Sequence, residues 1–287
     1  MGALWMLAAG LLFGCMGVLV KFGAAHFTSS ELVFYRSLFS LLILAAMMLN
    51  SRTPLATPHW RGHLWRGLSG SVAMMLFFYC IATLPLATAV SLNYTSSLFL
   101  ALLTLVVLRE KLHLPFGAAL TLGFLGVVLL LHPTLAREQF GSGLLGLLSG
   151  VLAAVAILNV RQLGQAGEPA LRIVFYFNLV ATLFSGAWMP MQGGLHAPNL
   201  TELALLAAIG ASATFAQLAM THAYRIGHTM AMSTLSYSTI AFASLFGLMI
   251  WHDTLPLASW LGMLLIVASG VVSLRLGPVY SQAKNEK

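Results

Sequence analysis

Long apolar runs separated by short polar gaps dominate this chain of 287 residues. Ten runs of roughly 20 residues can be marked, near positions 3–23, 30–49, 65–84, 87–108, 115–132, 143–163, 170–190, 201–222, 229–250 and 257–276. A helix needs about 20 residues to cross a hydrocarbon core about 30 Å thick, so each run predicts a transmembrane helix. The alternating segments of about ten residues that a membrane β-barrel requires are not found. The pattern therefore predicts an all-α membrane protein with ten transmembrane helices.

The prolines of the chain lie between the apolar runs or at their ends. Nine of the ten lie in or beside the gaps, and Pro190 ends a run. A proline in a helix interior removes a backbone hydrogen bond and bends the helix. Because none lies at mid-depth, the sequence predicts mostly continuous helices, without the broken helices of some transporters.

The two halves of the chain resemble each other weakly but in a consistent order. A shift of 141 residues aligns Arg36 with Phe177, and a shift of 143 aligns Asn93–Tyr94 with Ser236–Tyr237. The shift grows along the chain, as loop insertions would make it grow. An internal duplication in an apolar chain is typical of transporters whose binding site lies between two halves.

The distribution of Lys and Arg predicts the orientation of the helices. With a cytoplasmic N-terminus, eleven of these residues lie in inside gaps and the tail, and only Lys21 and Arg137 lie outside. The positive-inside rule therefore places both ends in the cytoplasm. Five spans per half is an odd number, so the second half is inverted relative to the first. We expect two inverted five-helix repeats, residues 1–135 and 140–277, followed by a cytoplasmic tail at 278–287.

Composition supports the lipid bilayer as the main solvent. The chain is 59% hydrophobic and only 7% charged, with a mean hydropathy of +0.91, whereas soluble domains carry about 25% charged residues. The net charge of +7 lies in gaps between apolar runs and not on one face or tail, so it does not indicate a nucleic-acid partner.

Signals for enzymatic chemistry, a cofactor or a metal site are missing from the sequence. The seven acidic residues lie at helix ends, in gaps or in the tail, so no carboxylate pair falls at mid-depth. Neither the cysteines Cys15 and Cys80 nor the pair His59 and His63 has the partners of a metal site. We therefore expect a non-enzyme without cofactor or metal, and proton coupling through a buried acid is disfavoured.

Arg36 is the most costly side chain for a membrane helix. It lies about seven residues into the second run, roughly 10 Å below the outer interface. A charge at that depth costs a few kcal/mol unless it is paired or hydrated. Two interpretations stay open: Arg36 or Lys21 meets an anionic group of a substrate, or Arg36 forms a structural ion pair with Glu31.

Neutral polar residues mark both halves at equivalent places. Asn93 and Tyr94 in span four correspond to Ser236 and Tyr237 in span nine, and further serines and threonines surround both pairs. Such groups suit a polar or zwitterionic metabolite, although hydrogen bonds between helices need the same residue types. The recurrence in both halves favours residues that line a transport path.

Other polar residues are expected along the same path. Asn159, Asn178 and Gln217 are single amides in spans six, seven and eight, and an amide in lipid is costly without a partner. Under the inversion they gather toward the cytoplasmic half, while Arg36, Tyr79 and Asn93 gather toward the outer half. A path lined from both sides is what alternating access requires.

The chain resembles ten-span members of the drug/metabolite transporter superfamily that are built from two EamA domains. The resemblance covers about residues 1–277 and is carried by Phe34–Leu38, Leu92–Phe99, Arg109–Leu112 and Trp251–Asp253. The family often has proline in span four, where this chain has Ser96 and Ser97, and glycine where it has Arg109; Asp253 stands for a glutamate.

The resemblance implies a central cavity between the halves, lined by spans other than five and ten, in a bacterial inner membrane. It implies export of amino acids or related metabolites first. Relatives with a similar Tyr-Arg-Ser motif import S-adenosylmethionine or riboflavin, so uptake of such a larger metabolite is the alternative. The expected partners are a small-molecule substrate and the lipid bilayer, and a homodimer stays open. A membrane scaffold, as a third interpretation, predicts paired polar groups and no cavity.

Overall fold

The computed structural model describes residues 2–96, 98–100, 102–103, 118, 121–129, 139–192, 197–226, 235–253 and 255–285. Within these ranges every element is helical and no strand occurs. The elements are α1 (Gly2–Gly23), α2 (Ser29–Ser51), α3 (Trp60–Thr83), α4 (Leu86–Tyr94), α7 (Phe140–Gln165), α8 (Ala170–Trp188), the short 3-10 helix η2 (Met189–Gln192), α9 (Leu200–Ile226), α11 (Ser238–Trp251) and α12 (Leu257–Asn285). The all-α fold is confirmed.

Six of these helices, α1, α2, α3, α7, α8 and α9, are long and apolar enough to cross a membrane. The predicted spans 87–108, 115–132 and 229–250 lie partly outside the described residues, as does the motif at 109–112. Residues 278–285, predicted as a tail, continue α12 as a helix.

The helices pack as two sets related by an approximate twofold axis. In the second half, α7, α8, α9 and α11 correspond to α1, α2, α3 and α4. The contact of α1 with α9 has its counterpart in α3 with α7, and that of α2 with α9 in α3 with α8. The contacts of α2 with α8 and of α4 with α11 each map onto themselves. The axis therefore passes through these last two helix pairs.

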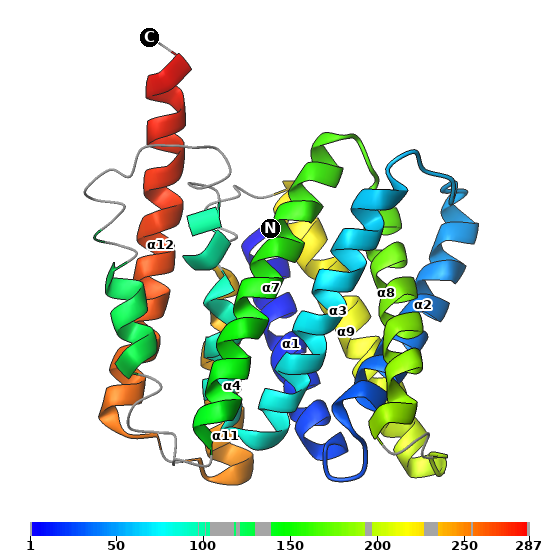
Figure 1. Ribbon diagram of the computed structural model, residues 1–287, viewed down its shortest axis with the longest axis horizontal. Coiled ribbons are helices and arrows are strands. Elements are labelled where there is room, and N and C mark those ends of the chain that lie inside the picture. The colour runs from blue at the N-terminus through cyan, green and yellow to red at the C-terminus, as the bar shows by residue number, and fades with distance from the viewer. Residues whose placement is uncertain are drawn as a thin grey trace.

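The second half is inverted relative to the first. In Figure 1, α1 runs downward from the N-terminus, whereas its counterpart α7 runs upward; α2 runs upward and its counterpart α8 downward. We call the end of the bundle where α1 begins and α12 finishes the terminal side, and the opposite end the far side. The inversion predicted from the span count and the charges is confirmed.

Spans four and nine are interrupted at equivalent positions, which the absence of mid-depth prolines did not predict. Helix α4 ends at Tyr94, and Tyr237 is the N-cap of α11. Both the hydroxyl and the backbone N–H of Thr95 donate to the carbonyl of Leu92, three residues back. Hydroxyl side chains compete with the helical ladder for such carbonyls. Thr95 and Tyr237 nevertheless keep right-handed helical backbone angles, and helical residues lie on both sides of each, so these spans carry a local irregularity within the mostly continuous helices that were expected.

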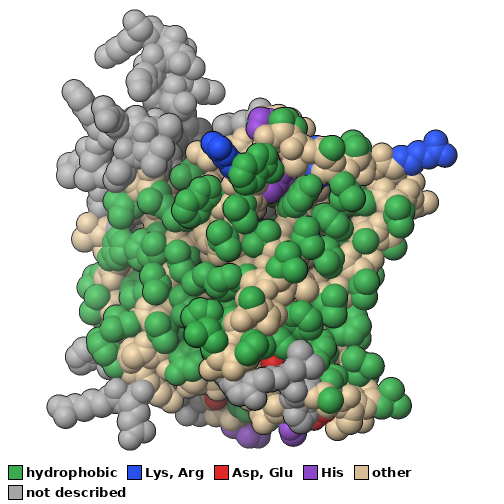
Figure 2. Space-filling view, turned by 45° about the vertical axis from the view of Figure 1, so that its right-hand side comes forward, with side chains coloured by type: hydrophobic (Ala, Val, Ile, Leu, Met, Phe, Trp, Pro, Cys, Tyr) green, Lys and Arg blue, Asp and Glu red, His purple; other side chains and the backbone are tan. Residues whose placement is uncertain are grey.

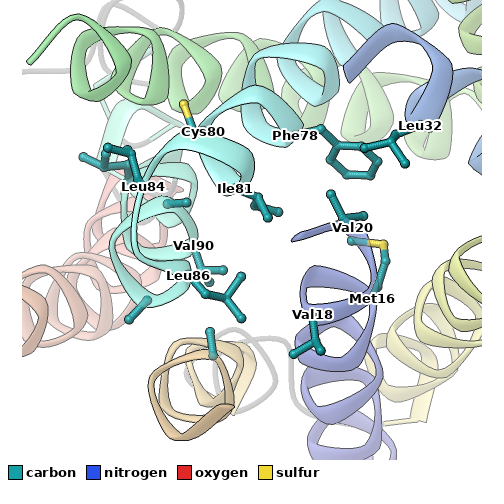
Figure 3. Packing of buried hydrophobic residues seen from close by; sticks show 14 of the residues in the cluster. Met16, Val18, Val20, Leu32, Phe78, Cys80, Ile81, Leu84, Leu86 and Val90 are labelled. Carbon is teal, nitrogen blue, oxygen red and sulfur yellow. The ribbon is translucent and has the colours of Figure 1, made fainter. Parts of the chain in front are cut away.

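Apolar packing closes the far-side half of the bundle between α1, α2, α3 and α4. Val20, Leu32, Phe78, Ile81 and Leu86 are at most 1% exposed and belong to one cluster of buried residues (Figure 3). Each lies in the far-side half of its helix. A polar solute could not pass this cluster without a rearrangement of the helices.

An ion pair also links helices on the far side of the bundle. Lys21 at the end of α1 lies 3.5 Å from the carboxylate of Asp253 just after α11, and it donates to the carbonyl oxygen of Leu84 at 3.3 Å. Its ammonium group also lies 4.6 Å from the ring centroid of Trp251. Lys21 thus joins α1 to α11 and to the end of α3.

The surface has the polarity of a bilayer-embedded protein. On the face shown in Figure 2, hydrophobic side chains form a broad band, while charged and histidine side chains gather near its upper and lower ends. Large apolar side chains such as Leu49, Leu183 and Leu264 are more than half exposed. Such exposure is stable where lipid replaces water.

Gly67 permits a close approach between α3 and α8, which leads to a first prediction. A Cβ at this position would lie 2.5 Å from the Cβ of Val180, a stiff β-branched neighbour. We expect Gly67→Ala to destabilise the protein by about 1–3 kcal/mol through overpacking. Thermal unfolding in detergent measures the loss. Gly164→Ala in α7 is the control, since open space surrounds that position; equal midpoints for the two variants would contradict the prediction.

Candidate functional site

A cavity of about 350 Å³ lies between the two halves, at the twofold axis. We call it the central cavity; every described α-helix except α12 contributes to its lining. Six of the nine residues predicted from the sequence line it, namely Arg36, Asn93, Tyr94, Gln217, Ser236 and Tyr237. Its volume is in the range of small-molecule sites, about 300–1,000 Å³.

The other three predicted residues have different places. Asn178 is fully buried behind Arg36. Asn159 is half-buried on α7 and does not line the central cavity. Tyr79 is 40% exposed and borders a separate depression near the far side, beside His26.

Arg36 is held at the crossing of α2 and α8. Its side chain is only 2% exposed, and its Nη1 donates to the Oδ1 of Asn178 at 3.1 Å. The amide nitrogen of Asn178 donates to the carbonyl of Val174 at 2.8 Å, which turns the amide oxygen toward the arginine. The guanidinium carbon lies 5.7 Å from the ring centroid of Phe177. The Nε has no hydrogen-bond partner among the described residues.

The proposed ion pair between Arg36 and Glu31 is not formed. Glu31 instead caps the start of α2: its carboxylate accepts from the backbone N–H of Thr28 at 2.8 Å and from the Thr28 hydroxyl at 2.9 Å. Lys21 is engaged by Asp253. Of the candidates for an anionic group of a substrate, Arg36 is therefore the one at the central cavity.

Arg66 is a residue of the central cavity that sequence reasoning missed. It was counted among the cytoplasmic charges, although it lies just inside the run 65–84, and that position was the available signal. Its guanidinium carbon is 4.2 Å from the ring centroid of Phe177. Its Nε and Nη1 are screened from solvent and have no hydrogen-bond partner in the described part of the chain.

The two arginines of the central cavity carry uncompensated charge. The ion pairs found among the described residues involve Lys21, His26, His63 and Arg172, and none includes Arg36 or Arg66. A buried charge without a partner is costly. Together they give one wall of the cavity a positive potential that suits an anionic ligand.

Equivalent residues of the two repeats touch at the axis on both sides of the central cavity. The rings of Tyr94 and Tyr237 lie 5.9 Å apart, and the Tyr94 hydroxyl donates to the Oγ1 of Thr239 at 2.8 Å. Arg36 and Phe177, also equivalent, meet at the other end. Asn93 reaches the Oγ of Ser149 on α7 at 3.4 Å. The polar residues of spans four and nine thus both line the cavity and bond across helices.

A second charged cluster lies on the terminal side, outside the central cavity. The carboxylate of Glu168 contacts Arg172 Nη1 at 2.9 Å and His63 Nε2 at 3.3 Å, and it accepts a hydrogen bond from Thr57. Arg172 Nε also donates to the carbonyl of Pro54 at 2.8 Å. This cluster ties the α2–α3 loop to the start of α8, which is a structural role.

The fold and the central cavity define a membrane transporter built from two inverted repeats. The chain matches the model of the EamA-like transporter family over residues 1–132 and 141–275. It therefore belongs to this family, whose characterised relatives are transporters and not enzymes.

Individual relatives cover almost the whole chain. A pseudopaline exporter of Pseudomonas aeruginosa, CntI, is 31% identical over 93% of this chain and 94% of its own length. A riboflavin transporter of Vibrio cholerae is 26% identical over 93% of this chain and 91% of its own. A solved crystal structure, 20% identical, covers 97% of this chain and 98% of its own with a TM-score of 0.67, which supports the fold alone.

The Glu168 cluster leads to a prediction about stability and pH. Burial would raise the pKa of Glu168, but hydrogen bonds from Thr57, Arg172 and His63 lower it below its ordinary value of 4.5. Its contribution to folding is therefore complete above pH 4.5 and is lost as the pH falls through the lowered pKa. We expect Glu168→Gln to lower the free energy of unfolding by on the order of 2 kcal/mol at neutral pH. The variant should also lose less stability than wild type as the pH falls.

Unfolding midpoints measured in detergent between neutral pH and about pH 3 test this expectation. Glu202→Gln is the matched control, because Glu202 lies 4.0 Å from His26, whose side chain is 61% exposed. An ion pair with an exposed partner at this distance contributes little, and a glutamine side chain can still accept the hydrogen bond that the backbone N–H of Asn199 donates to Glu202 at 2.8 Å. Identical pH profiles for wild type and Glu168→Gln would contradict the assignment.

Proposed function

We propose that this protein exports a small carboxylate-bearing metabolite, an amino acid or a related compound, from the cytoplasm by alternating access. The observation that carries the proposal is the buried guanidinium of Arg36 at the central cavity, which has an amide partner but no acidic one. An arginine with donors to spare recognises a carboxylate through paired, charge-assisted hydrogen bonds.

The rest of the central cavity suits the other end of an amino acid. Asn93, Gln217 and Ser236 supply neutral polar groups, and the rings of Tyr94 and Tyr237 offer aromatic faces to an ammonium group. No acidic side chain lines the cavity among the described residues. A zwitterion would therefore be held mainly by its carboxylate, with the ammonium group near the tyrosines.

The asymmetry between the two sides supports alternating access. The far side is closed by the apolar cluster and by the pair of Lys21 with Asp253, whereas Arg66 and Met220 extend the cavity lining toward the terminal side. The positive-inside bias makes the terminal side cytoplasmic, so this conformation loads substrate from the cytoplasm. In inverted repeats, the opposite state arises when the halves exchange conformations.

Uptake of a larger metabolite with a ring system, such as riboflavin or S-adenosylmethionine, is the second candidate. The observation that favours it is the aromatic share of the lining, with Phe13, Phe77 and Phe177 beside the two tyrosines. Flat aromatic side chains suit a stacked heterocycle. The riboflavin transporter among the relatives supports this candidate, as the pseudopaline exporter supports export.

Flux across proteoliposome membranes tests both candidates. Labelled amino acids, riboflavin and S-adenosylmethionine are supplied in turn, and transport is compared with that of protein-free vesicles. We expect accumulation of a carboxylate-bearing compound, and a loss of about tenfold or more in Arg36→Gln, since a charge-assisted hydrogen-bonded pair contributes about 1.5–3 kcal/mol.

Arg61→Gln is the matched control, because Arg61 is an exposed arginine of α3 that does not line the central cavity. Its flux should equal that of wild type. Flux of riboflavin that survives Arg36→Gln would favour the second candidate. Flux of none of the compounds would contradict both.

A further inference from the structure

We infer that the central cavity selects a substrate with two anionic groups on a short spacer, one group for Arg36 and one for Arg66. The inference rests on the proposed function, because it concerns the same cavity. It adds a second recognition residue, Arg66, and it narrows the substrate class from carboxylate-bearing metabolites to dianions such as dicarboxylic amino acids.

The geometry brings the two guanidinium groups to one aromatic side chain. Both guanidinium carbons lie within about 6 Å of the ring centroid of Phe177, the range of a cation–π contact. Arg36 reaches it from α2 and Arg66 from α3. The two positive charges are close enough to repel each other. A ligand that spans the Phe177 ring can therefore meet both groups at once.

Unused donors distinguish Arg66 from the structural arginine of the same bundle. Arg172 donates to Glu168 and to the carbonyl of Pro54, which satisfies it within the protein. Arg66 has no such contact among the described residues: its Nε and Nη1 lack partners, although both are screened from solvent. Arg36 also keeps an unpartnered Nε. Donors left unpaired in a buried cavity are costly unless a ligand uses them.

Charge balance favours a dianion over a monoanion. An uncompensated arginine within a membrane bundle is costly. A single carboxylate neutralises one of the two and leaves the other repelled and unpaired. Two carboxylates neutralise both, and the apolar ring of Phe177, which lies near both guanidinium groups, suits the carbon spacer that joins them.

Gly70 makes this position of Arg66 possible. It lies one turn further along α3, and a Cβ there would collide with Nη1 of Arg66 and would lie 2.9 Å from the Phe177 ring. The nearest colliding atom, Nη1 of Arg66, is the free end of a flexible side chain, so an alanine displaces the guanidinium furthest, and the Phe177 ring shifts by a smaller amount. A methyl group at position 70 therefore tests where the charge of Arg66 must be.

The experiment uses pairs of substrates that match in shape and differ by one charge. Proteoliposome flux and its KM are measured for L-glutamate against L-glutamine and for L-aspartate against L-asparagine. We expect the acidic member of each pair to be preferred by about tenfold or more, as one additional charge-assisted pair predicts. Arg66→Gln should remove this preference, because it raises KM for the acidic member more than for the amide member.

Two further variants keep the test valid if Arg66→Gln folds poorly. Gly70→Ala should weaken the preference in the same direction while Arg66 is retained, and Arg66→Lys should restore part of it because the charge is kept. Arg61→Gln serves as the control on the same helix and should leave the preference unchanged, since Arg61 is exposed and outside the lining.

The outcomes separate this inference from the proposed function. Equal flux of the acidic and amide members overturns the inference, as does a preference that Arg66→Gln and Gly70→Ala leave unchanged. In either case, flux that depends on Arg36 still upholds the proposed function. Transport of other metabolites without any of the acidic ones also overturns the inference alone. Vesicles that transport none of the compounds contradict both.

Discussion

A guanidinium group inside an apolar membrane bundle is stable only where other groups replace the water it has lost. At the crossing of α2 and α8, Asn178 gives Arg36 one hydrogen bond and Phe177 gives it an aromatic face. Neither contact neutralises the charge. Its Nε keeps no hydrogen-bond partner among the described residues, and Arg36 lies at the wall of the central cavity. An anion bound there would replace part of the hydration that the guanidinium lost and would neutralise its charge.

The inverted repeat brings equivalent residues together along the axis, and the two places where this happens differ in chemistry. Tyr94 and Tyr237 keep the symmetry, whereas Arg36 faces Phe177. The exchange of conformations between the halves needs only a common backbone scaffold. Recognition of an asymmetric metabolite needs unlike groups on the two sides. The scaffold can therefore be symmetric while the side chains at the binding site are not.

Individual residues show how far the sequence could predict the site. Arg36, Asn93 and Gln217 line the central cavity as expected, because polar groups in lipid are driven toward the interior. Tyr79 points away from it, since an amphipathic aromatic is also stable at the bundle surface. Arg66 was missed because a charge near a helix end is usually solvated. Its position in the sequence did not show that the side chain extends along α3 past Gly70 and contacts the ring of Phe177.

The sequence by itself determined the helices and their inversion, because the length of apolar runs and the placement of positive charge are constraints that the bilayer applies to each segment separately. Its short motifs, such as Phe34–Leu38, indicated the family. Only the tertiary structure decided which face of each helix lines the cavity. Lipid and protein interior have nearly the same polarity, so an apolar helix carries little signal for its rotation. The convergence of two arginines on Phe177 depends on contacts between helices far apart in sequence.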